Sequence, residues 1–292
     1  MKVRNDSAAS RIFDVFNYIF LGVYGVACIL PFAYVVAASF ASESEIISRS
    51  VFLFPKKPTV AAYEFIMSSP TLPRAFLTSV GVTLAGTATN MVLTLTMGFA
   101  LSKKYLIGRG VIMNFIAFTL VFSGGLIPTF LVVKSVGLLN SYGALIFPGA
   151  ISAFNLIVIK NFFQNLPAEL EDAAKMDGCT DFMVFTRIAL PLSMPVIATF
   201  TLMYAVGHWN DYYSALIYIP ADNKKWPLQL ILRQIVMLTA GRVEDMDYTM
   251  TPPPAQSIKM AVIVVATVPI LCVYPFLQKH FAKGVLMGSV KG

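Results

Sequence analysis

The chain has 292 residues, of which 57% are hydrophobic and 13% charged, and its mean hydropathy is +0.72. In soluble domains about a quarter of all residues are charged, so this composition excludes an ordinary soluble enzyme. The net charge of +7 does not indicate nucleic-acid binding, because Lys and Arg stand at the ends of apolar stretches rather than on one face. We predict a single membrane domain over 1–292, with its core at about 70–285, and no nucleic-acid partner.

Six apolar stretches are long enough to cross a bilayer as helices. A helix rises 1.5 Å per residue, so about 20 apolar residues cross a hydrocarbon core of about 30 Å. The sequence therefore predicts an all-α membrane protein with six transmembrane helices. The stretches are 12–39, 76–101, 111–134, 142–163, 192–219 and 258–281. The first is about twice as long as the apolar part of a signal peptide and is expected to be retained.

Basic residues near the ends of these stretches predict their orientation. The short loop 102–110 carries Lys103, Lys104 and Arg109, whereas the equally short loop 135–141 carries no Lys or Arg. Both termini are also basic. By the positive-inside rule, the loop 102–110 and both termini face the cytoplasm, and the loop 220–257 is external.

The cytoplasmic segment 165–191 has the pattern of two short helices joined by a glycine. Pro167 suits the first turn of a helix, and Gly178 is a natural left-handed stop. Acidic side chains favour the positive end of the first helix; they are Glu169, Glu171 and Asp172. A second helix is expected over 181–188, closed by Leu190-Pro191.

This segment resembles the coupling loop of permease subunits in bacterial ABC importers. That loop has the pattern Glu-Ala-Ala, three residues, Gly, and then an Ile-x-Leu-Pro ending. Asp172-Ala173-Ala174, Gly178 and Ile188-x-Leu190-Pro191 occupy these positions at matching spacing. Asp172 replaces the usual Glu, so its carboxylate reaches about one methylene less far. The resemblance implies the type I ABC importer permease fold, with 165–191 as the cytoplasmic coupling-helix loop.

In this family the coupling loop inserts into a cleft of a separate ATPase subunit. The resemblance implies that the contacts come from Glu169, Glu171, Asp172, Ala173, Ala174, Asp177, Gly178, Phe182, Leu190 and Pro191. The sequence has no Gly-x-x-x-x-Gly-Lys-[Ser/Thr] motif. ATP and Mg are therefore expected in the partner ATPase, with no cofactor bound by this chain. The implied partners are a second homologous permease, two ATP-binding subunits, an extracytoplasmic solute-binding protein and membrane lipid.

Two further segments narrow the resemblance to carbohydrate importers. Gly207-His-Trp-Asn-Asp-Tyr-Tyr213 is similar to permeases of the maltose-permease kind, and the ending 258–292 is similar to an oligosaccharide subgroup. That subgroup includes importers of uronic-acid oligosaccharides such as aldouronate or alginate fragments. The resemblance implies import of a sugar-type solute, an oligosaccharide, across the bacterial cytoplasmic (inner) membrane.

Polar residues inside a membrane span usually face a cavity or the helix bundle. Side chains with aromatic faces, amides or carboxylates suit the apolar faces and hydroxyl edges of sugars. The candidates for the substrate path are Trp209, Asn210, Asp211, Tyr212, Tyr213 and Asn155, with Asn90 and Asn114 as further possibilities. An interfacial aromatic belt with ordinary helix–helix hydrogen bonds explains the same residues. His208 is interpreted as structural.

The sequence shows no nucleophile–base set and no metal-ligand cluster, so it predicts a transport subunit rather than an enzyme. The alternative is an ion- or proton-coupled secondary transporter. That alternative is disfavoured because Asp211 is the only well-placed carboxylate in a span, and because no internal repeat is visible.

Overall fold

The structure is a computed structural model that describes residues 8–49, 51–68, 70–239 and 256–288. All regular secondary structure in these residues is helical, and no strand occurs among them. The predicted all-α class is therefore confirmed. The chain divides into two compact units, one formed by 1–69 with 235–267, the other by 70–234 with 268–292.

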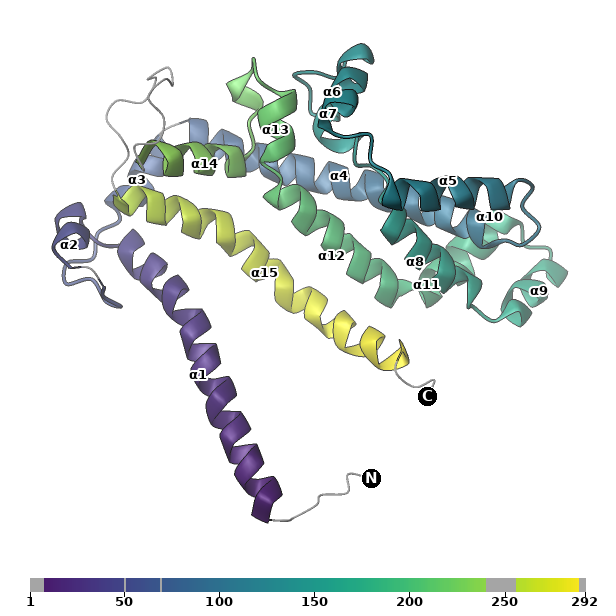
Figure 1. Ribbon diagram of the computed structural model, residues 1–292, viewed down its shortest axis with the longest axis horizontal. Coiled ribbons are helices and arrows are strands. Elements are labelled where there is room, and N and C mark those ends of the chain that lie inside the picture. Colours follow the sequence, from purple (N-terminus) through teal and green to yellow (C-terminus); the bar gives the residue numbers. More distant parts are fainter. Residues whose placement is uncertain (1–7, 50, 69, 240–255, 289–292) are drawn as a thin grey trace. The chain divides into compact units, whose positions relative to one another are not determined.

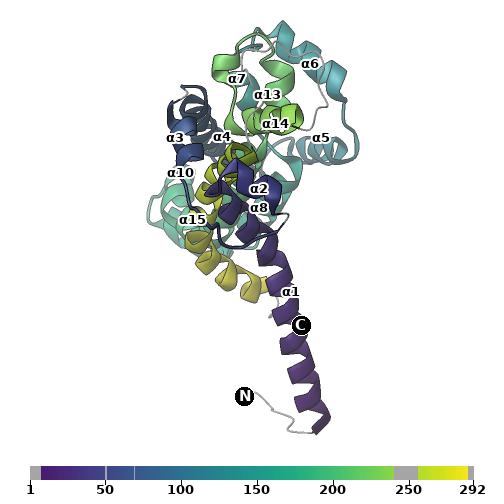
Figure 2. The ribbon, with the colours of Figure 1, turned by 90° about the vertical axis from the view of Figure 1, so that its left-hand side faces the viewer.

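The first unit contains α1 (Ala8–Ser39), α2 (Glu43–Ser48) and α3 (Ala61–Ser68), with the end of α14 and the start of α15. The helix α1 is continuous in both views (Figures 1 and 2). Within its most apolar 18-residue stretch, no residue is buried inside the protein. Beyond it, Glu45 fixes the loop that follows α2. Its carboxylate accepts a hydrogen bond from Lys56 N at 2.9 Å and pairs with Arg49 at 2.9 Å.

The second unit carries the helices that form the candidate sites. Its elements are α4 (Thr71–Ser102), α5 (Arg109–Val121), α6 (Leu126–Ser135), α7 (Gly143–Ile146), α8 (Ala153–Gln164), α9 (Ala168–Met176), α10 (Asp181–Val184), a π-helical turn (Phe185–Ala189), α11 (Leu190–Leu192), α12 (Met194–Asn210), α13 (Tyr213–Tyr218), a 3-10 turn (Asn223–Lys225), most of α14 (Leu228–Thr239) and the end of α15 (Gln256–Gly288).

The predicted count of six spans is not confirmed. Within the described residues, three helices are long and apolar enough to cross a membrane, over Ser10–Ser39, Thr71–Ser102 and Gln256–Val273. A bent pair, Asp181–Leu192 with Met194–Asn210, raises the number to four if it counts as one span. The stretches expected as continuous helices at 111–134, 142–163 and 192–219 are each interrupted.

Local chemistry explains two of the three interruptions. Between α5 and α6, Gly125 adopts φ +84°, a conformation that few residues other than glycine accept. Gly124 precedes this residue, and Pro128 lies in the first turn of α6. Between α12 and α13 the helix stops at Asp211, whose carboxylate accepts a hydrogen bond from Ser214 N at 3.0 Å and so starts the next helix.

The core of the second unit lies where α4 packs against α8 and α12 (Figure 1). Small residues on α4 permit this close approach: a Cβ on Gly98 would lie 3.0 Å from the side chain of Ile159. Buried aromatic and aliphatic side chains fill the remaining space; they are Met91, Leu95, Ile159, Phe163, Phe185, Phe200 and Tyr204.

Candidate coupling loop and translocation pocket

The first helix of the coupling loop, α9, begins and ends as the sequence predicts. Pro167 is the residue before its first turn, and Gly178 adopts φ +81° just beyond its end. The backbone N–H of Cys179 donates to Ala174 O at 2.9 Å and that of Gly178 to Lys175 O at 3.0 Å. This double closure satisfies carbonyls that a helix end otherwise leaves without partners.

The second helix of the loop departs from the prediction. Thr180 caps α10 by accepting a hydrogen bond from Met183 N at 3.3 Å, as a threonine before a helix does. The helical path then continues through the π-helical turn and α11, so Leu190-Pro191 does not close it as expected. Pro191 lies at the start of α11, where a missing N–H costs little. The path turns by 83° into α12.

An ion-pair cluster joins the coupling loop to the end of α4. Glu171 binds Lys103, which follows α4, and Lys175 one turn along α9 at 2.9 Å. Lys175 also pairs with Asp181 at 3.3 Å, and the hydroxyl of Tyr105 donates to the same carboxylate at 3.3 Å. The loop 102–110 and the coupling loop therefore lie on the same side of this unit (Figure 1).

The charges in this cluster shift one another's protonation. Burial raises the pKa of the Glu171 carboxyl, but the hydrogen bonds from Lys103 and Lys175 outweigh it, and the net pKa lies below the ordinary 4.5. The hydrogen bond to Glu171 raises the pKa of Lys175. Both groups are therefore charged at neutral pH, and Glu171 is occupied by partners of its own chain.

The pairing of Glu171 predicts an acid-sensitive attachment of α9. The pKa of Glu171 is lower in the folded protein than its ordinary value of 4.5. The ion pairs of Glu171 therefore stabilise the fold fully above pH 4.5, and this stabilisation is lost as the pH falls through the pKa of the folded state. Cleavage of the 165–191 loop by pepsin is expected to accelerate below that point. In the matched variant Glu171→Gln, this acid step should be absent; an identical pH profile in the two proteins would contradict the pairing.

The outward surface of the coupling loop is apolar with an acidic edge. Met176 is 89% exposed and Phe182 71% exposed. Most of the predicted coupling residues are also exposed: Glu169, Asp172, Ala173, Asp177, Gly178 and Pro191. Ala174 is buried within the chain, and Glu171 and Leu190 are half-buried. We call the exposed set, with Met176 and Phe182, the docking surface.

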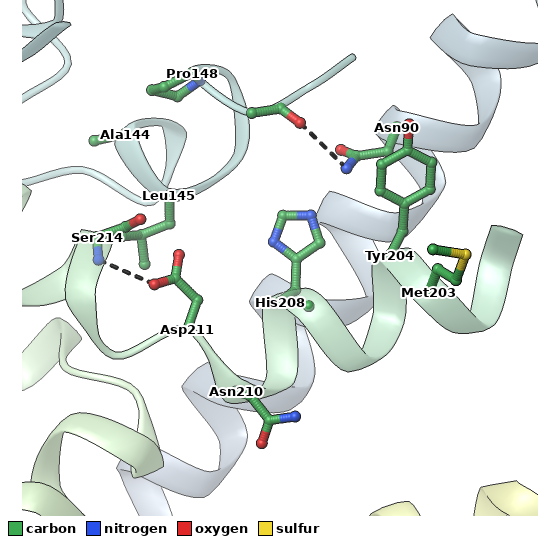
Figure 3. A pocket seen from close by; sticks show the side chains of 12 residues that line it. Asn90, Ala144, Leu145, Pro148, Met203, Tyr204, His208, Asn210, Asp211 and Ser214 are labelled. Carbon is green, nitrogen blue, oxygen red and sulfur yellow. Dashed lines mark hydrogen bonds between the residues drawn. The ribbon is translucent and has the colours of Figure 1, made fainter. Parts of the chain in front are cut away.

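A pocket of about 440 Å³ opens between α4, α7, α12 and the start of α13 (Figure 3). Its polar lining includes Asn90, Tyr204, His208, Asp211 and Ser214. In Figure 3 the His208 ring points into the space between Asn90, Leu145 and Asp211. The volume lies within the roughly 300–1,000 Å³ that is usual for small-molecule sites.

The position of His208 depends on a glycine in the facing helix. A Cβ built on Gly86 of α4 would lie 2.5 Å from His208 Nε2 and 2.7 Å from Cε1. No real Cβ tolerates such contacts, so only glycine lets the imidazole lie against α4. Two buried atoms of this wall, Asn90 Oδ1 and His208 Nε2, have no hydrogen-bond partner within the described part of the chain.

The structure brings together only part of the predicted substrate path. Asn210 and Asp211 belong to the pocket lining, but the Asn210 side chain points away from His208 and donates to Val206 O at 3.0 Å (Figure 3). Trp209 is buried and packs edge-on against Phe76 at 5.9 Å. The remaining candidates do not line this pocket: Asn155 is buried near the start of α8, and Tyr212 and Tyr213 are exposed.

Comparison with known proteins places these features in a family. A family model described as "Binding-protein-dependent transport system inner membrane component" matches residues 3–287. The chain is 56% identical to Protein LplC of Bacillus subtilis (strain 168), over 99% of this chain and 98% of that protein. It is 54% identical to the polygalacturonan/rhamnogalacturonan transport system permease protein YtcP of the same organism, over 97% of this chain and 99% of that protein.

A solved structure shares the fold. It is the crystal structure of a bacterial ABC transporter involved in the import of the acidic polysaccharide alginate, with a TM-score of 0.87 and 29% identity. The match covers 96% of this chain and 100% of the solved one. This chain therefore belongs to the binding-protein-dependent transport system inner membrane components, the permease subunits of ABC importers.

Proposed function

We propose that this permease subunit carries an acidic oligosaccharide, of the polygalacturonan or alginate kind, into the cell. The single observation that carries this proposal is similarity at 54% identity, over nearly the full length, to a permease named for polygalacturonan and rhamnogalacturonan. The relationship in fold to an alginate importer points to the same class of anionic cargo. The pocket between α4 and α12 is the candidate path for this cargo.

Two arginines support an anionic cargo. Arg74, near the start of α4, is exposed, and no ion pair is found for it among the described residues. It lines a second hollow together with Thr78 and Tyr142. Arg233 places its guanidinium 4.5 Å from the ring centre of Tyr212. In the orientation that the positive-inside rule predicts, both arginines lie on the external side, where cations attract uronate carboxylates.

The energy source is proposed to be a pair of separate ATPase subunits. The docking surface offers the exposed apolar side chains and acidic edge that a partner's cleft requires. A second permease completes the path, an extracytoplasmic binding protein delivers the cargo, and both termini lie in the cytoplasm. The sequence has no Gly-x-x-x-x-Gly-Lys-[Ser/Thr] motif, so the proposed role of this chain is to move with the ATPases.

The choice between this function and an ion- or proton-coupled transporter rests on the energy source. Cells that express the importer should lose uptake of labelled oligogalacturonides when ATP is depleted at a maintained membrane potential. Uptake should persist when an uncoupler removes the proton gradient while ATP is held high. The reverse pattern would overturn the proposal in favour of the secondary transporter.

A further inference from the structure

This inference rests on the proposed function and concerns the pocket between α4 and α12. Membrane interiors penalise polar groups that lack partners, and native proteins leave few of them unpaired. The unpaired atoms of the described residues cluster along one line of α4 and its contact with α12. They are Thr83 Oγ1, Thr87 Oγ1, Asn90 Oδ1 and His208 Nε2, with Ser193 Oγ elsewhere. Residues 83, 87 and 90 share a helix face because they are spaced by four and three.

Other polar side chains between α4 and α12 have hydrogen-bond partners, so the packing of these two helices does not by itself leave polar atoms unpaired. The hydroxyl of Tyr204 bonds Thr94 Oγ1 at 3.0 Å and accepts a hydrogen bond from Ser152 N at 3.3 Å. Asn90, by contrast, is only 2% exposed, donates a long bond of 3.5 Å to Gly149 O and leaves its carbonyl oxygen without a donor. Asn90 and Tyr204 both line the pocket, and of these two only Asn90 has an unpaired side-chain atom.

We infer that Asn90 and His208 form a subsite that binds the hydroxyl edge of a sugar ring in transit. A hydroxyl both donates and accepts, and the amide and the imidazole together offer donor and acceptor atoms that can meet both needs. The pyranose C–H face then lies against apolar neighbours in the lining, such as Met203, Leu145 and Pro148. Gly86 sets the geometry, since it alone lets the His208 ring reach this depth.

The charges of the pocket argue that this subsite takes hydroxyls and not uronate carboxylates. Among the described residues that line it, none is Lys or Arg, and the one charged side chain is Asp211. A carboxylate of the cargo would be repelled by Asp211 and would find no cation. An acidic oligosaccharide therefore passes with its hydroxyl edge toward Asn90 and His208. Its carboxylates face elsewhere.

The test uses the complete importer, purified with its partners and reconstituted in vesicles with ATP and the binding protein. Uptake of a reducing-end-labelled oligogalacturonide mixture is measured for Asn90→Leu, which keeps the shape and removes the hydrogen bonds, and for His208→Phe. Each is expected to lower uptake about tenfold, the loss that accompanies one unmade hydrogen bond with its partner left unpaired. Subunit composition should stay unchanged, which shows that the complex still assembles.

Matched variants separate binding from packing. Gly86→Ala displaces the His208 ring without removing a polar group and should behave like His208→Phe. Gly81→Ala lies on the same helix, and no described residue of another element comes within 4 Å of its new Cβ, so this variant should transport normally.

The outcomes distinguish this inference from the proposed function. If the unaltered importer takes up no oligogalacturonide with ATP, the proposed function fails. If it does so while Asn90→Leu, His208→Phe and Gly86→Ala all transport within twofold of it, the subsite is wrong and the function stands. Should Asn90→Leu not assemble, the Gly86→Ala and Gly81→Ala pair decides: equal uptake in the two would overturn the subsite.

Discussion

Replacing Phe182 with aspartate is expected to release the ATPase subunit from this permease. Phe182 belongs to the docking surface and is 71% exposed within the described part of the chain. An aromatic side chain that fills a partner's pocket typically contributes 2 kcal/mol or more, or about 30-fold in affinity. Co-purification of the ATPase with Phe182→Asp should therefore fall by about that factor, and ATP-dependent uptake should fall with it.

The matched variant is Phe182→Leu, which keeps an apolar side chain at the same place. It should retain most of the ATPase, since only part of the buried area is lost. Both variants should reach the membrane in normal amount because Phe182 makes no core contact, unlike Phe185, which is 7% exposed and packs against Phe99 at 5.0 Å. Full ATPase recovery with Phe182→Asp would show that the exposed face is not the docking surface.

A β-branched residue at Gly178 is expected to uncouple transport from ATP hydrolysis. Gly178 adopts φ +81°, and its N–H and that of Cys179 close α9. The left-handed conformation costs an ordinary L-residue about 1–2 kcal/mol, and more for a β-branched one. Gly178→Val should therefore shift α9 relative to α10 and reduce uptake by at least tenfold, while the protein still inserts in the membrane.

Asparagine is the informative control at this position. It tolerates the left-handed region better than other residues, so Gly178→Asn should retain most of the uptake although it adds a side chain. Apart from the two adjacent residues, no atom of the described part of the chain lies within 4 Å of a Cβ built on Gly178, so crowding there does not explain a defect. Unchanged uptake in Gly178→Val, measured at equal protein level, would remove the coupling loop from the mechanism.

The coupling loop shows what local sequence determines. Pro167 and Gly178 act within one turn of their own positions, and the start and end of α9 were predicted correctly from them. The end of the second helix was predicted wrongly, because Pro191 was interpreted as a stop. A π-helical turn before it lets a new helix begin at Leu190, and no residue pattern announces such a turn. The importer family itself, inferred from this loop, is confirmed by the match over residues 3–287.

The pocket shows what local sequence leaves open. Asn90 and His208 come from α4 and α12, and their proximity depends on how two helices far apart in the chain pack. His208 was interpreted as structural, and its position depends on Gly86 of the facing helix, which the sequence analysis did not single out. Composition and span length likewise predicted continuous helices, because hydropathy does not register a break of a few residues such as that at Gly125.

The most direct test of the central claim is to purify the tagged chain from its native membrane in mild detergent and identify what accompanies it by mass spectrometry. A permease driven by ATP should bring with it a second, homologous permease and an ATPase subunit that carries the phosphate-binding motif absent from this chain. Recovery of the chain alone or only with copies of itself, in several detergents, would contradict the importer and favour the ion-coupled transporter.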